Sequence, residues 1–247
     1  MTLGHFIAIF VAGLAAGTIN TVVGSGSLIT FPTLVTLGYA PLVANVSNNI
    51  GLVPGSVSGM YGYRRELRGQ ARRLLRLAPM SALGGATGSL LLLALPSSVF
   101  KKVVVVLIAI ALVLVVSQPK LARRLAARRE ANVVSSDSVP PVLAFLVCAA
   151  GVYGGYFGAA QGIILIAMLG IFLDDELQRL NACKNVLAGT VNGVASIAFL
   201  VNWHHIDWAV VGTIAVGSTL GGQIGAKVGR RFNTKVLRGV IVVVGLA

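Results

Sequence analysis

The sequence predicts an all-α polytopic membrane protein made of two homologous halves, on three observations. Of its 247 residues, 56% are hydrophobic and only 11% are charged, whereas a soluble domain carries about 25% charged residues. Apolar runs such as 103–116 and 139–173 are long enough to read as membrane spans. A pattern that opens at Gly13 returns at Gly151 and covers nearly the whole chain, as in transporters built from two related halves.

The repeat is carried by small residues in a fixed order. Three glycine pairs keep one spacing: Gly13 on Gly151, Gly17 on Gly155 and Gly24 on Gly162. Two later segment pairs continue the match: LGGATG (83–88) with LGGQIG (220–225), and LPSSVFKKVVVV (95–106) with FNTKVLRGVIVV (232–243). The repeat divides the chain into three parts: a first transmembrane repeat (1–117), a basic cytoplasmic linker (118–139) and a second transmembrane repeat (140–247).

Each half is expected to begin with a broken helix. Residues 3–37 are mostly apolar and exceed the roughly 20 residues needed to cross once. Several glycines and Pro32 interrupt them, at costs of about 1 and 3 kcal/mol in a helix interior. We therefore predict two short helices, 3–18 and 27–38, joined by a GSGS turn. The other predicted helices cover 45–63, 77–95, 99–117, 141–158, 162–173, 183–201, 208–226 and 237–247.

The distribution of charge bears on topology. The 20 lysines and arginines lie in or beside short segments between the apolar runs. This distribution follows the positive-inside rule, excludes nucleic acid as a partner and favours anionic lipid. If residues 3–37 cross once, the halves are parallel and 11 basic residues face 9 across the membrane. If they cross twice, the halves are inverted and the count is 18 against 2, which favours ten crossings. The number stays open between eight and ten, because one short pair can be re-entrant.

The stretch GTINTVVGSGS (17–27) is the main functional signal. Non-helical backbone at membrane depth is tolerated only where protein or water satisfies its polar groups. A helix that starts after Gly26 would present free N–H groups and a positive dipole end, where an anion fits. Close helix packing is the alternative, and we assign it to Gly13 and Gly17. For three residues the sequence leaves both interpretations open, close packing and substrate binding: Ser25, Gly26 and Ser27.

Further polar residues extend the candidate site. The second break, YFGAAQG (156–162), offers the two amide donors of Gln161. Asn45 and Asn181 are expected to N-cap the third helix of each half. Lys184 is expected inside a helix, where an anion-facing or structural role competes with snorkelling. We predict a substrate site between the halves, near the bilayer midplane, formed by Asn20, Ser25, Gly26, Ser27, Asn48, Gln161, Lys184 and Asn185.

The sequence shows no pattern typical of an enzyme, a metal site or a cofactor site. Cys148 and Cys183 have no CxxC or Cys/His spacing. The seven acidic residues fall in expected loops or helix ends, whereas proton-coupled carriers usually need an intramembrane carboxylate or histidine. We therefore expect an uncoupled permease, because an anion leaving a negative interior already gains about 2.3 kcal/mol per charge per 100 mV.

At these residues the sequence resembles the TauE/SafE family of sulfite exporters, also called the 4-toluenesulfonate uptake permease family. The resemblance lies in GTINTVVGSGSLITFPTL, LGYAPLVANVSNN and YRREL in the first half, and in GVYGGYFGAAQG, the pair Cys183–Lys184 and HIDW (205–208) in the second. The chain departs from the family pattern at three places. Family members often have a run of glycines where this chain has Ser25 and Ser27, and they commonly have an acidic residue near Asn20, which this chain lacks. The loop at 68–71 also lacks the VDW-like element that this chain retains at 206–208.

The resemblance implies a multi-pass permease of the bacterial inner membrane that exports sulfite, sulfonates, sulfoacetate or related small organic anions. Its partners would be the small anion and membrane lipid, and a homo-oligomer is compatible with the sequence. Two alternatives stay open: an importer or channel for the same anions, and a non-transporting membrane scaffold or sensor.

Overall fold

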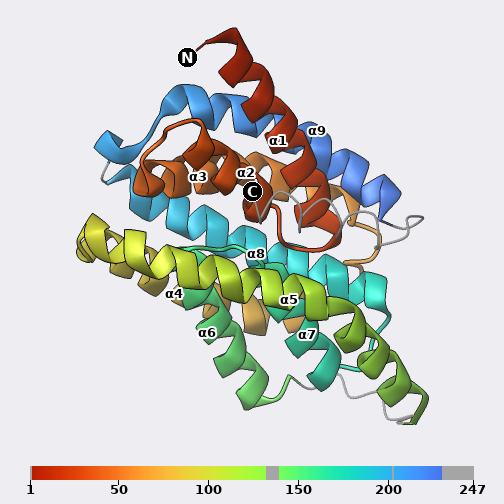
Figure 1. Cartoon of the computed structure of the whole chain (residues 1–247). Coiled ribbons are helices and arrows are strands. Elements are labelled where there is room, and N and C mark those ends of the chain that lie inside the picture. Colours follow the sequence, from red (N-terminus) through yellow and green to blue (C-terminus); the bar gives the residue numbers. More distant parts are fainter. Residues whose placement is uncertain (1, 132–138, 202, 230–247) are drawn as a thin grey trace.

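The computed structural model describes residues 2–131, 139–201 and 203–229, and all regular elements in these ranges are helices (Figure 1). Five of them are long and apolar enough to cross a membrane, namely α1, α4, the first part of α5, α8 and α9. The predicted class of all-helical membrane protein is confirmed. The helices are α1 (Leu3–Val22), α2 (Ser27–Thr36), α3 (Pro41–Gly62), α4 (Ala71–Ala94), α5 (Ser97–Ala131), α6 (Pro141–Tyr156), α7 (Gln161–Phe172), α8 (Leu177–Leu200) and α9 (Trp208–Val228), with a 3-10 turn, η1 (Trp203–His205).

Most helices predicted within these ranges are confirmed, with shifted ends. α3 starts at Pro41 instead of residue 45, because proline suits the first turn of a helix. α8 starts at Leu177 instead of residue 183. α5 continues to Ala131, so residues 118–131 of the expected linker are helical. The predicted helix 237–247 and the repeat segment 232–243 lie outside the described residues.

Both predicted helix breaks are present and end their helices in the same way. The N–H of Gly24 donates to the carbonyl of Ile19 at 3.1 Å, and that of Gly158 donates to Tyr153 at 3.2 Å. Both glycines have left-handed backbones, with φ of 85° and 78°, a conformation that commonly terminates helices and that glycine adopts at no steric cost.

The breaks therefore correspond when Gly24 is set on Gly158, one helical turn away from the alignment of Gly24 on Gly162 made from the sequence. α1 and α6 then end together, and α2 and α7 begin together. The physical reason for the error is the small-residue pattern of these helices. Glycines spaced four apart look the same after a shift of one turn, so their spacing alone cannot fix the register.

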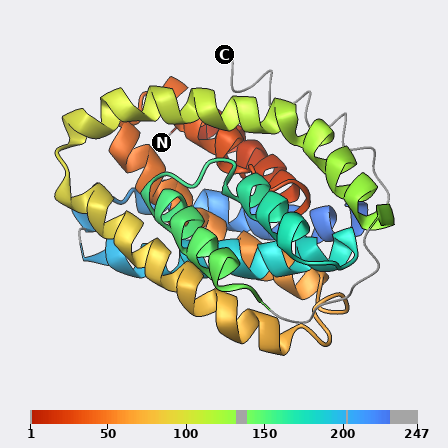
Figure 2. The same cartoon turned by 90° about the horizontal axis from the view of Figure 1, so that it is seen from below.

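Glycines let the long helices approach closely. α1 packs along α9, and α6 packs along α4 (Figures 1 and 2). A Cβ atom on Gly17 would lie 2.3 Å from the carbonyl oxygen of Ser218, and one on Gly84 would lie 2.1 Å from that of Cys148. A Cβ on Gly13 would lie 3.1 Å from the Cα of Ile214. The packing role predicted for Gly13 and Gly17 is confirmed.

One end of the molecule, here named the arginine end, gathers Arg73, Asp175 and Arg179. Asp175 pairs with both arginines at 2.7 Å. The end of α9 lies here too, because Gln178 donates to the carbonyl of Gly229 at 3.4 Å. The α3–α4 connection, the α7–α8 connection and the end of α9 therefore share one end of the bundle.

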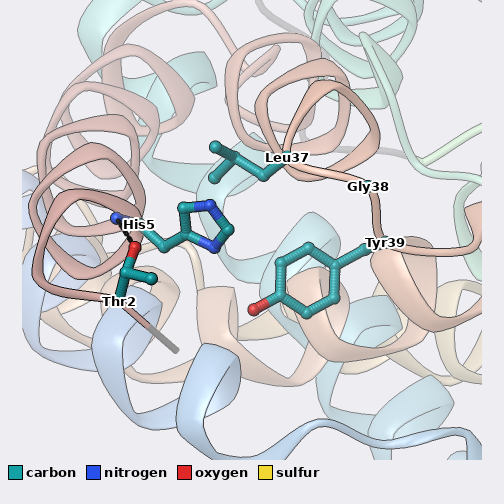
Figure 3. Close-up of a pocket in the computed structure, with 5 residues that line it drawn as sticks. All are labelled: Thr2, His5, Leu37, Gly38 and Tyr39. Carbon is teal, nitrogen blue, oxygen red and sulfur yellow. Dashed lines mark hydrogen bonds between the residues drawn. The ribbon is translucent and has the colours of Figure 1, made fainter.

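The opposite end, here named the Tyr39 end, gathers the start of α1 and the α2–α3 connection. Thr2 and His5 line a pocket together with Leu37, Gly38 and Tyr39, and His5 and Tyr39 point toward one another across it (Figure 3). Residues 2–39 thus start and finish at the same end of the molecule.

The first helices of the two breaks start at different ends. Thr18 near the end of α1 lies against Gly225 near the end of α9, so α1 runs from the Tyr39 end toward the arginine end. α6 runs beside α4 instead, with Cys148 against Gly84 and Val152 against Gly88. Because α4 starts at the arginine end, α6 starts there as well.

Candidate functional site

The two helix breaks touch each other inside the bundle. The N–H of Gly162, in the first turn of α7, donates to the carbonyl of Gly24 at 3.0 Å. A Cβ atom added to either glycine would lie 2.4 Å from the Cα of the other. Only two glycines permit this approach, so the contact depends on residues from both breaks.

The second break is closed by its own side chains. Tyr153 donates its hydroxyl proton to the carbonyl of Ala159, and Ala159 and Ala160 are fully buried. Ala160 has φ of 61°, a strained value for a residue with a Cβ. Gln161 turns back into α6 and donates to the carbonyl of Ala150 at 3.2 Å.

The first break leaves a polar group without a partner. Ser25 is 1% exposed, and among the described residues its hydroxyl has no hydrogen-bond partner. Gly26 N-caps α2 and no side chain caps this helix end. Asn48 of α3 donates to the Ser27 hydroxyl at 3.2 Å and accepts from the Thr30 hydroxyl. A buried hydroxyl and an uncapped helix start therefore lie together.

Lys184 reaches the other side of the same break. Its ammonium group is buried at 1% exposure and donates to the carbonyls of Asn20 at 3.0 Å and Thr21 at 3.3 Å. These carbonyls belong to the last turn of α1, where backbone acceptors have no partner within the helix and the dipole is negative. Asn185 also donates to the Thr21 carbonyl, at 3.2 Å.

The asparagines predicted as N-caps act elsewhere. The N-caps of α3 and α8 are Ala40 and Glu176, because these helices start four and six residues earlier than predicted. Asn45 instead donates to the carbonyl of Tyr156 at the end of α6, at 3.1 Å. Asn181 donates to the carbonyl of Thr21 near the end of α1, at 3.2 Å. Each third helix thus satisfies the end of the first helix in the other part of the chain.

A polar seam continues between α3 and α8. The Ser196 hydroxyl donates to Asn49 at 3.1 Å, and Asn192 donates to the Ser56 hydroxyl at 3.5 Å. Sequence reasoning missed this seam. The signal available was the run of amide and hydroxyl side chains at turn spacing in α8: Asn181, Asn185, Asn192 and Ser196.

The structure brings most of the predicted site residues into two adjoining groups. Lys184 and Asn185 meet the end of α1, where Asn20 contributes its carbonyl. Ser27 and Asn48 meet at the start of α2. Gly26 joins the groups, because a Cβ on it would lie 2.8 Å from the Cβ of Asn20. Gln161 lies apart, against α6.

The arginine end carries a network that sequence reasoning did not predict. Asp175 is bound by Arg73 and Arg179, and its side chain is 12% exposed. Burial raises the pKa of Asp175, but the hydrogen bonds and charges of the two arginines outweigh burial and hold the pKa below its usual value. Gln70 extends the network by donating to the carbonyls of Glu66 at 2.8 Å and Arg179 at 2.9 Å.

Within the described ranges, no group of three or more His, Cys, Asp or Glu residues could hold a metal ion. The interior offers a cation, amides, hydroxyls and a helix start, gathered where two helices break. Buried polar groups at broken helices are typical of membrane transporters.

The comparison with known proteins agrees. The family model for the sulfite exporter TauE/SafE matches residues 9–247. The chain belongs to this family of membrane transporters.

Curated relatives match over almost their full length. A probable membrane transporter protein of Haemophilus influenzae is 28% identical over 95% of this chain and 89% of the relative. The probable membrane transporter protein YfcA of Escherichia coli K12 is 26% identical, over 96% and 85%. The probable membrane transporter protein ORF9 of a Sinorhizobium species is 27% identical, over 98% and 90%. No solved structure matches this chain significantly.

Proposed function

We propose that this transporter is a permease of the bacterial inner membrane that exports small anions, such as sulfite, sulfonates or sulfoacetate, through a site between two inverted halves. The observation that carries the proposal is Lys184. Its ammonium group is buried, and among the described residues no carboxylate forms an ion pair with it.

Burying an ammonium group without a counter-charge loses the free energy of its hydration, and the dipoles of nearby carbonyls offset only part of that loss. Lys184 has carbonyl partners on α1, which leave its net charge uncompensated. A small anion bound beside Lys184 would supply the missing charge. The substrate is therefore negative, because in the part of the chain that the structure describes no carboxylate pairs with Lys184.

The arrangement of the ends supports inverted halves. A parallel arrangement with four spans in each half would place loops 64–76 and 174–182 on opposite sides of the membrane. Yet Arg73 pairs with Asp175 at 2.7 Å, and Gln70 donates to the Arg179 carbonyl at 2.9 Å. α1 and α6 also start at opposite ends. With five crossings or half-crossings in each half, both loops face the cytoplasm, as the positive-inside rule requires.

The roles within the site follow from position. Lys184 and Asn185 would bind the anion from α8, and Ser25, Ser27 and the start of α2 would donate to it from the first break. Gly26 lets α2 start close to α1, and Asn20 and Asn48 hold the two groups in place. Gln161 would donate from the second break after leaving Ala150. Export follows because a negative cytoplasm drives anions outward.

The test is flux of labelled sulfite and of a small sulfonate in proteoliposomes with an imposed membrane potential of either sign. We expect flux that reverses with the potential and needs no proton or sodium gradient. Flux that requires such a gradient would contradict the uncoupled mechanism. Absence of flux with any anion would favour the scaffold or sensor. Acceleration by substrate on the far side would identify a carrier and exclude a channel.

A further inference from the structure

Asn181 carries a buried acceptor that nothing in the described structure uses. The side chain is 6% exposed, and its nitrogen donates to the carbonyl of Thr21 at 3.2 Å. A carbonyl can only accept, so the nitrogen must face Thr21 and the oxygen must face away. That oxygen, Oδ1, is buried and has no hydrogen-bond partner among the described residues.

Such orphaned acceptors are rare in folded proteins and call for an explanation. Asn181 lies one turn before Lys184 and Asn185 on the same face of α8, and all three side chains donate to Thr21. Another orphan, the hydroxyl of Ser25, lies in the break that follows α1. These two unused polar atoms thus flank the end of α1, where the anion is proposed to bind.

The chemistry of the orphan is specific. An amide oxygen accepts and never donates, so an oxyanion or carboxylate oxygen cannot satisfy it. A hydroxyl can. We propose that Asn181 is a specificity-determining residue of this site, and that among the small anions of the proposed function the site prefers those that carry a hydroxyl group.

In this arrangement, which rests on the proposed function, the anionic head of the substrate faces Lys184 and its hydroxyl donates to Asn181 Oδ1. An analogue with a methyl group in place of the hydroxyl fits the same volume but leaves Oδ1 unpaired. Sites built to pair a substrate hydroxyl reject such analogues strongly, because a buried polar group is left without a partner. An analogue of this kind therefore isolates the contribution of Asn181.

The matched probes are 2-hydroxyethanesulfonate and 1-propanesulfonate, which differ by hydroxyl against methyl. Their ability to compete with a transported labelled sulfonate is measured in proteoliposomes. The wild-type protein should prefer the hydroxy compound by about tenfold or more. Asn181→Leu should bring the two compounds to within about twofold of each other, because the acceptor is gone.

Asn45→Leu is the control. It removes the corresponding amide hydrogen bond, from Asn45 to the Tyr156 carbonyl, but Asn45 has no orphaned buried acceptor among the described residues. This variant should keep the wild-type preference. An equal loss in both variants would overturn the proposal and assign the effect to helix-end packing.

If a variant does not fold, the preference of the wild-type protein still tests the proposal. Equal competition by the hydroxy and methyl compounds overturns it, and a preference of about tenfold or more for the hydroxy compound supports it. Failure here is distinguishable from failure of the proposed function. Transport of both sulfonates without preference refutes only the role of Asn181. Transport of no anion refutes the permease itself.

Discussion

The contact between the two helix breaks can be tested with four glycine-to-alanine variants that separate its physical causes. Gly24 has φ of 85° and a clash 2.4 Å from Gly162. Gly162 has the same clash without a left-handed backbone. Gly38 has φ of 91°, but no atom lies near the position of a Cβ. Gly193 has neither a left-handed backbone nor an atom near that position.

The magnitudes follow from these four environments. A left-handed residue with a Cβ costs about 1–2 kcal/mol, and overpacking a dense interior costs about 1–3 kcal/mol. Gly38→Ala and Gly162→Ala should each lose one of these amounts, and Gly24→Ala should lose about 2–5 kcal/mol from the two together. Gly193→Ala should gain up to about 1 kcal/mol, because alanine favours the helix.

Thermal unfolding of the detergent-purified variants, followed by size-exclusion chromatography with fluorescence detection, gives the order. For a chain of this size, 1 kcal/mol moves the midpoint by about 2–4 °C. We expect Gly24→Ala to be the least stable, Gly38→Ala and Gly162→Ala to be intermediate, and Gly193→Ala to match or exceed the wild type. A Gly24→Ala midpoint no lower than that of Gly38→Ala would refute the contact between the breaks.

Three further predictions concern the ends and the packing of the bundle. Ser81→Ala and Ser218→Ala should each lower the free energy of unfolding by about 1 kcal/mol in the same assay, because the two hydroxyls donate to the Leu187 and Gly51 carbonyls at 2.9 Å. An unchanged unfolding midpoint in either variant would show that the bond does not stabilise the fold. Asp175→Asn should cost about 2 kcal/mol while the exposed Glu176→Gln changes little, and equal midpoints would contradict the network at the arginine end. Because the folded pKa of Asp175 is lowered, its stabilisation is present above the unfolded carboxyl pKa of about 3.9 and is lost as pH falls through the folded value; Asp175→Asn should flatten this acid-side decline, and a parallel decline in both proteins would count against it.

The breaks were predictable from sequence because glycine is unfavourable inside helices, and residues 23–26 and 157–160, which contain Gly24, Gly26 and Gly158, are indeed non-helical. Pro32, which was also expected to interrupt the apolar stretch, lies inside α2. Their register was not, because a four-residue glycine spacing tolerates a one-turn shift. The prediction that Lys184 lies inside a helix is confirmed. Its partners on α1 could not be foreseen, since backbone carbonyls at a helix end leave no signature in the side chains.

The asparagines show the same limit. Asn45 and Asn181 have the residue type of helix N-caps, and a sequence alone cannot separate an amide that caps its own helix from one that reaches another helix. The pairing of Arg73 with Asp175 joins positions 102 residues apart, and no local pattern encodes it. The candidate site was therefore predicted as a set of residues, and its division into two groups came from tertiary packing.

The central claim is that the buried charge of Lys184 serves a transported anion, and the most direct measurement is the current evoked by sulfite in proteoliposomes of two matched variants. Lys184→Met and Lys227→Met each remove one positive charge at similar side-chain length, but Lys227 is exposed near the end of α9. We predict a current for the wild type and for Lys227→Met, and at least about a tenfold loss for folded Lys184→Met protein. A wild-type current from Lys184→Met would contradict the account.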